Sequence, residues 1–173
     1  MRKRIRQVHC PSNSAISSWL PGADLADAFA VEITKTDAAR GIETLARSVL
    51  GHPAPWFRVL LSIRDVAMRP LGVRSSRQLQ QNAVAAGKNH IDFFRIIAQS
   101  DAEIVLGEDD RHLDFRISLL LRPVRDGERD ELVATTVVRC HNLTGRIYLG
   151  IIAPVHRQVI RSNLAAATRR NWQ

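Results

Sequence analysis

The segment Leu113-Asp-Phe-Arg-Ile-Ser-Leu-Leu-Leu-Arg122 is followed, after Asp126-Gly127, by Leu132-Val-Ala-Thr-Thr-Val-Val-Arg-Cys140, and these two segments are the most informative about the fold. Asp-Gly between two segments of alternating hydrophobicity indicates a β-hairpin. A turn centred on Asp126-Gly127 fixes the register of the two strands. One face of the hairpin is then apolar and consists of Leu113 with Cys140, Phe115 with Val138, Ile117 with Thr136, Leu119 with Ala134 and Leu121 with Leu132.

The opposite face of this hairpin is more polar. Cross-strand pairs of opposite charge contribute roughly 0.2–1 kcal/mol each to a sheet. A slip of one residue would send every apolar side chain to the wrong face, so the agreement of both faces supports this register. The polar face pairs His112 with His141, Asp114 with Arg139, Ser118 with Thr135 and Arg122 with Glu131.

The segment after the hairpin predicts a long C-terminal helix. Asn142 is a suitable N-cap for it, and Pro154 should kink the helix or split it in two, because proline removes a backbone donor. Since the helix follows the hairpin directly, we expect its apolar stripe to cover the apolar face of the sheet. The stripe includes Leu143, Ile147, Ile151, Val155, Val159 and Leu164.

The segments before the hairpin predict a mixture of strands and helices. Thr36 or Asp37 is the expected cap of a helix that ends at Gly51, and a second helix begins near Pro55 and stops at Pro70. The other expected elements are a short helix at 14–20, a strand at 28–33, a loop at 73–90 and strands at 92–98 and 103–106.

Composition and charge place the chain among single-domain globular proteins. It has 173 residues, of which 45% are apolar, and a formal charge of +8. That charge is concentrated at the two ends of the chain, so the body of the domain is neutral and specific nucleic-acid binding is not expected. The cations at the ends are Arg2, Lys3, Arg4, Arg6, Arg157, Arg161, Arg169 and Arg170.

The sequence also predicts a cytoplasmic location. No apolar run approaches the roughly 20 residues that span a bilayer, and the basic N-terminus lacks the apolar core of a signal peptide. Cys10 and Cys140 are outside any Cys-x-x-Cys pair, which favours reduced thiols. We expect an irregular basic segment at residues 1–13 and one domain at residues 14–173.

The order of the expected elements resembles the helix-grip fold of the START and pollen-allergen type, often called SRPBCC. Four segments are more specific: residues 20–29, Arg64-Asp65 with residues 70–72, residues 106–116, and residues 135–142 with 145–148. These segments look like a bacterial family of unknown function whose members occur alone or fused behind an NAD(P)-binding epimerase-like domain.

This resemblance implies a curved antiparallel sheet around the C-terminal helix, with a cavity between them for a small apolar molecule. No Gly-x-Gly-x-x-Gly motif is present, so we expect no nicotinamide site and no other cofactor in this chain. A separate oxidoreductase is a possible partner, because members of the family occur in such fusions. The expected lining residues are Phe115, Ile117, Thr136, Val138, Arg146, Tyr148, Ile151 and Val155.

A second hypothesis is an enzyme of the cyclase or isomerase type. His112, Asp114, Arg139 and His141 would meet at one end of the sheet and could transfer protons to and from a carbonyl substrate. The competing interpretation is a polar ladder that faces water.

Three further polar positions have alternative interpretations. The acids at 108–110 could hold a cation but are more typical of a solvated turn, and we expect no metal site. Asn142 could contact a ligand instead of capping the helix. His156, beside Pro154, is either a core or surface histidine or a side chain that enters at the kink.

Overall fold

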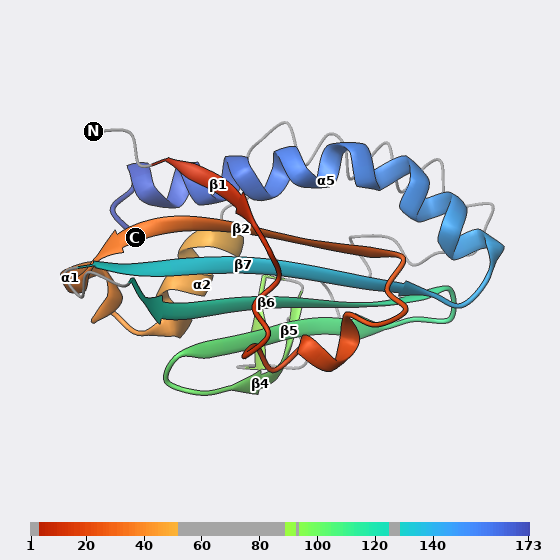
Figure 1. The fold of residues 1–173 in the computed structure, drawn as a ribbon, viewed down its shortest axis with the longest axis horizontal. Coiled ribbons are helices and arrows are strands. Elements are labelled where there is room, and N and C mark those ends of the chain that lie inside the picture. The colour runs from red at the N-terminus through yellow and green to blue at the C-terminus, as the bar shows by residue number, and fades with distance from the viewer. Residues whose placement is uncertain (1–3, 52–88, 93, 125–128) are drawn as a thin grey trace.

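The computed structural model describes residues 4–51, 89–92, 94–124 and 129–173 (Figure 1). Within this part, the chain forms an antiparallel seven-stranded sheet with the strand order β1-β2-β7-β6-β5-β4-β3 and a long C-terminal helix, so the α+β class is confirmed. The strands are β1 (Ile5–Val8), β2 (Leu25–Thr34), β3 (His90–Ile91), β4 (Phe94–Gln99), β5 (Glu103–Asp109), β6 (Leu113–Pro123) and β7 (Arg129–Cys140). The helices are the 3₁₀-helix η1 (Ser17–Trp19), α1 (Lys35–Ala38), α2 (Ile42–Leu50) and α5 (Leu143–Arg169).

The register of the β6–β7 hairpin is the one that the sequence predicts. Leu113 lies opposite Cys140, Ile117 opposite Thr136 and Leu121 opposite Leu132. The turn residues 125–128 lie outside the described residues. The strands expected at 28–33, 92–98 and 103–106 are also present, with bounds that differ by a few residues.

One face of the sheet, called here the inner face, packs against α2 and the second half of α5. In β6 this face carries the odd-numbered side chains, so alternation sends every second residue into the core. The core contains side chains from β2, β3, β5, β6 and β7 and from both helices, among them Phe29, Leu119, Ala134, Leu45, Val49, Ile160 and Leu164.

Helix α5 is buried along only half of its apolar stripe. Val159 and Leu164 are buried, whereas Leu143, Ile147 and Ile151 are exposed, so the prediction that the whole stripe covers the sheet is wrong. The helix is continuous through Pro154, which contradicts a split, and it is bent in Figure 1. A proline within a helix removes one hydrogen bond, and the remaining backbone bonds can hold the two halves together.

The start of α5 is capped as the sequence predicts. The side-chain oxygen of Asn142 accepts a hydrogen bond of 3.1 Å from the backbone amide of Gly145. No helix in the described part of the chain is both long and apolar enough to cross a bilayer.

The N-terminal segment (residues 4–24) contains a strand, so the prediction of an irregular segment at residues 1–13 is wrong for Ile5–Val8. These residues form β1 and pair with β2 from Ile5 opposite Val31 to Val8 opposite Ala28. Without β1, the backbone groups of β2 that point away from β7 would form an unpaired sheet edge. After β1 the segment crosses the opposite face of the sheet, called here the outer face, and reaches η1 (Figure 1).

The helices that follow β2 begin at other residues than expected. Thr34 caps α1 by accepting from the amide of Asp37, so the prediction of a cap at Thr36 or Asp37 is wrong. Gly41 has a φ of 85°, a left-handed conformation that ends the first helix before α2 begins. Gly51 is the C-cap of α2, as predicted. The helix expected from Pro55 and most of the loop expected at 73–90 lie outside the described residues.

Candidate functional site

Asp27 lies on the inner face of the sheet, beneath the middle of α5. In β2 it has the same parity as Phe29, which is in the core, and it lies opposite Thr136 of β7. Only 3% of the residue is exposed. The docking of α5 brings His156 Nε2 to 3.4 Å from Asp27 Oδ1, and Arg157 Nε lies 3.7 Å from Oδ2.

The polar atoms of this pair are unsatisfied. Three buried atoms have no hydrogen-bond partner among the described residues: the two carboxylate oxygens of Asp27 and Nε2 of His156. Buried polar atoms in native proteins nearly always have a partner, because an unmade bond costs about 1–3 kcal/mol or more. The arrangement therefore has unused capacity for a hydrogen-bonding group that is not part of the described chain.

Some of the predicted lining residues share the inner face with Asp27. Ile117, Thr136 and Val138 are buried there, at 4–6% exposure. Phe115 is partly buried, and its ring meets that of Phe94 edge-on at 5.8 Å between centroids. This part of the face is therefore apolar except for Asp27 and the hydroxyl group of Thr136.

The lining residues predicted on α5 lie in different environments. Tyr148 and Val155 are partly buried, whereas Arg146 and Ile151 are exposed. Ile151 has 55% of its surface exposed, which argues against a role in an enclosed pocket.

The four candidate acid–base residues lie on the outer face or at its end, away from α2. Asp114 lies opposite Arg139 in the sheet, as predicted, but its side chain pairs with His141 instead, with Oδ2 and Nε2 3.0 Å apart. Arg139 instead donates to the carbonyl oxygens of Ser18, Trp19 and Pro21. His112 Nδ1 lies 3.3 Å from the side-chain oxygen of Asn142.

These contacts give the four residues structural partners. The N-terminal segment binds Arg139 because its carbonyl oxygens offer several acceptors for one guanidinium group. The guanidinium carbon also lies 4.9 Å from the centroid of the Trp19 ring. The polar face of the hairpin is thus partly covered by chain, and it is not simply a ladder that faces water.

The acids at 108–110 also have other partners. Asp109 forms a salt bridge of 2.7 Å with Arg116, whose guanidinium lies 4.0 Å from the centroid of the Trp19 ring. Over the described ranges, no three His, Cys, Asp or Glu side chains converge as metal ligands would.

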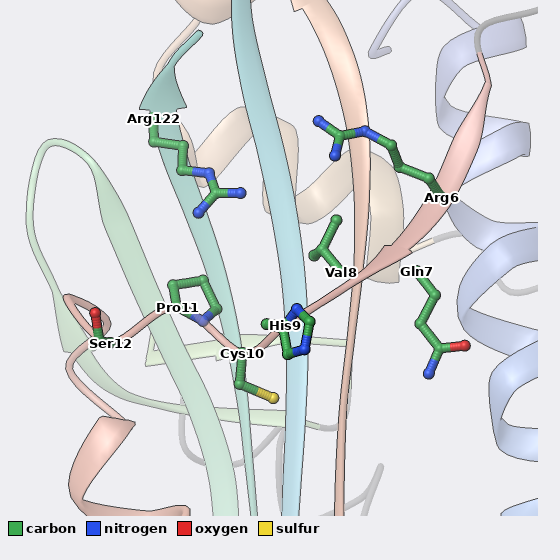
Figure 2. A pocket seen from close by; sticks show the side chains of 8 residues that line it. All are labelled: Arg6, Gln7, Val8, His9, Cys10, Pro11, Ser12 and Arg122. Atoms are coloured by element: carbon green, nitrogen blue, oxygen red, sulfur yellow. The ribbon is translucent and has the colours of Figure 1, made fainter. Parts of the chain in front are cut away.

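A second feature is a hollow of about 470 Å³ on the outer face (Figure 2). It is lined by residues 6–12 of the N-terminal segment and by Arg122 of β6. Arg122 and Arg6 both bind the carboxylate of Glu131, which is buried between them on β7. Burial, and to a lesser degree the charge of Asp27, raises the pKa of the Cys10 thiol in this hollow.

Sequence reasoning missed Asp27 as a site residue, although a signal was present. Asp27, Phe29, Val31 and Ile33 alternate along one strand, and an aspartate in such a row points into the core. For His156 the sequence left a core or surface role and a role at the kink open. The structure places its Nε2 atom beside Asp27.

Comparison with known proteins identifies a family but no function. A family model described as "Protein of unknown function (DUF2867)" matches residues 19–163, a range that contains both Asp27 and His156. No curated protein and no solved structure shows a significant match to the chain.

Proposed function

We propose that this chain, which belongs to the DUF2867 family of proteins of unknown function, binds a small, mostly apolar molecule between the inner face of its sheet and α5. Asp27 and His156 would form the polar end of the site. The helix-grip arrangement suggested by the sequence is part of this proposal, because in that fold the ligand lies between the sheet and the last helix.

The observation that carries the proposal is the unsatisfied buried carboxylate of Asp27. A hydroxyl or amine group of a ligand would donate to it, and a hydrogen bond to a charged acceptor contributes about 1.5–3 kcal/mol. His156 Nε2 can donate or accept according to its tautomer, so it suits the same polar group.

The side chains beside Asp27 favour an apolar body for this ligand. Ile117 and Val138 present only carbon atoms, and Thr136 adds a methyl and a hydroxyl group. Apolar contact contributes about 25 cal/mol per Å² of buried surface, so a ligand with one polar end and an apolar body would use both parts of the face.

Binding can be tested by native mass spectrometry and thermal shift with paired compounds. Long-chain alcohols, sterols and aromatic amines would be compared with analogues that lack the hydroxyl or amine group. We expect the donor-bearing compounds to bind and Asp27→Asn to weaken them about tenfold, which corresponds to about 1.4 kcal/mol.

The control for this experiment is Asp101→Asn, because Asp101 is exposed. It should bind as the unaltered protein does. A uniform lack of binding over the whole set, or equal binding by the Asp27→Asn variant, would remove the proposal.

The same pair of residues favours a proton-transfer enzyme as a second candidate. If the 3.4 Å contact between Asp27 and His156 shortened to a hydrogen bond in a complex with substrate, the carboxylate would orient the ring as a general base. Such an enzyme would turn over a bound carbonyl compound, and His156→Gln would abolish turnover while leaving binding measurable. Binding without any conversion in the unaltered protein would exclude it.

The oxidoreductase partner stays a prediction.

We also infer a cytoplasmic location from the cysteines. Cys10 and Cys140 are both free thiols, and reduced cysteines are typical of cytosolic proteins. Fractionation of the source cells would test this inference.

A further inference from the structure

We propose that the hollow on the outer face binds a small oxyanion group, a phosphate or a carboxylate, through Arg6 and Arg122. This site lies on the opposite side of the sheet from Asp27 and uses other residues, so it is tested separately from the ligand site proposed above.

The two arginines are held in place by one buried carboxylate. Arg6 belongs to β1 and Arg122 to β6, and Glu131 of β7 lies between them in the sheet. Arg122 donates to Glu131 Oε2 from Nε at 3.0 Å and from Nη2 at 2.7 Å, and Arg6 donates from Nη2 to Oε1. Because Glu131 is only 3% exposed, its position is fixed by the surrounding chain and it aims both guanidinium groups.

Both guanidinium groups keep donors for another acceptor. The hydrogen bonds made by the described residues use Nε and Nη2 of Arg122 and Nη2 of Arg6. Nη1 of Arg122, and Nε and Nη1 of Arg6, have no partner in the part of the chain that the structure describes. Figure 2 shows the two side chains extending toward one another above the hollow. Planar guanidinium groups in this arrangement suit the oxygens of phosphate and carboxylate groups.

The charge of the hollow is positive. Two guanidinium groups meet one carboxylate, and no aspartate or glutamate is among the residues that line the hollow. Cys10 adds no negative charge at neutral pH, because burial raises its pKa. Glu32, a neighbour of Glu131 on the same face, is paired with Arg129 at 3.2 Å. An anion would therefore offset an excess of positive charge.

The path of the N-terminal segment creates the hollow. After Val8 the chain leaves the edge of β2 and crosses the outer face, where the buried Pro11 rests. The resulting space of about 470 Å³ is larger than one phosphate group. It therefore suits an oxyanion that is part of a larger molecule.

Isothermal titration calorimetry with inorganic phosphate and, in a separate arm, with acetate would test this site at constant ionic strength. We expect saturable binding of at least one of the two anions, and the stronger binder identifies the oxyanion. Arg122→Gln should weaken binding about tenfold or more. Arg161→Gln removes the same charge from an exposed position on α5 and should leave binding unchanged.

A folding defect in Arg122→Gln would also weaken binding, because this variant leaves Glu131 with Arg6 as its only partner of the two. A second variant separates the two causes. Arg122→Lys keeps the charge beside Glu131 but loses the planar pair of donors. It should remain folded by circular dichroism and bind the anion more weakly than the unaltered protein does. The proposal is wrong if neither anion binds saturably, if Arg161→Gln weakens binding as much as Arg122→Gln, or if Arg122→Lys binds as the unaltered protein does.

Discussion

Glu103 and Asp27 are two buried carboxylates with opposite surroundings. Glu103 accepts from the hydroxyl groups of Ser14 and Ser118, both at 2.5 Å, and from the amide of Ala15 at 2.9 Å. Asp27 accepts no hydrogen bond from the described residues. A buried carboxylate with three hydrogen bonds is stabilised in place. One that has only the longer ion-pair contacts to His156 and Arg157 is the better candidate for a ligand site.

We expect Glu103→Ala to destabilise the protein by about 2–4 kcal/mol, because the variant leaves buried donors of the N-terminal segment and of β6 without an acceptor. Urea unfolding would measure the change. Glu43→Ala is the control: Glu43 bonds Arg47 at 2.8 Å on an exposed helix face, and its loss should cost below about 1 kcal/mol. Equal losses in both variants would contradict the role of Glu103.

The two thiols predict a dependence of stability on pH. Burial is the main cause that raises the pKa of both Cys10 and Cys140, and the charges of Asp27 and Asp24, respectively, add to it. The folded state therefore holds these protons more tightly than the unfolded state. The resulting stability is present below the pKa of a free thiol, about 8.5, and is lost as the pH rises through the folded pKa values.

Unfolding measured between pH 7 and pH 10 would check this expectation. The fall in stability above the free-thiol pKa should be smaller in a variant with Cys10→Ser and Cys140→Ser than in the unaltered protein. The folded protein should also react with iodoacetamide more slowly at pH 8 than the protein in denaturant. Equal reaction rates would show that the thiols are not perturbed.

At the level of the elements, the first turn of α5 is held by hydrogen bonds and by close packing. Asn142 caps the helix and also donates to the carbonyl oxygen of Arg111 at 3.1 Å. Gly145 lies directly against the carbonyl oxygen of His112, and a Cβ added there would overlap it. These contacts hold the start of α5 to the start of β6, although Leu143 and Ile147 are exposed.

Alanine substitutions at two glycines of α5 should have opposite effects. Gly145→Ala should destabilise the protein by about 2 kcal/mol or more, because the backbone of His112 must move. The Cβ atom added by Gly150→Ala meets no atom within 4 Å, so this substitution should stabilise the protein by about 0.5–1 kcal/mol, since alanine favours a helix. Thermal unfolding of both variants would measure the difference, and a stabilised Gly145→Ala variant would show that α5 is not docked this way.

At the scale of the whole molecule, both faces of the sheet are covered by chain. Helices α2 and α5 cover the inner face, and the N-terminal segment crosses the outer face (Figure 1). The C-terminus also returns to the core: Trp172 is fully buried and its amide donates to the carbonyl oxygen of Ala167. Arg170 and Gln173 bond Ser48, which ties the end of α5 to α2.

Because of this packing, Trp172→Ala should cost about 3–5 kcal/mol, the range for removing a large buried side chain. Leu143→Ala removes an apolar side chain from the same helix at a position that is 71% exposed, and it should cost below about 0.5 kcal/mol. Urea midpoints of the two variants would compare them. A small effect of Trp172→Ala would mean that the C-terminus is not part of the core.

Much of the sheet could be predicted because its signals are local. Alternation from Leu113 to Leu121, together with Asp126-Gly127, was enough for the register of β6 and β7, and Asn142 was enough for the helix cap. The cap at Thr34 was not predictable from capping preference alone, since Thr36 and Asp37 are equally suitable residue types.

Local signals in the sequence were enough for most of the strands other than β1, for their alternation and for the start of the last helix, because turns, caps and side-chain parity depend on neighbours along the chain. Three contacts became visible only in the folded molecule: Asp27 meets His156, Arg6 joins the predicted pair of Arg122 with Glu131, and Trp172 enters the core. These contacts join segments that are distant in the sequence. They follow from where α5 docks and where the N-terminal segment crosses, and both are set by the packing of the whole molecule.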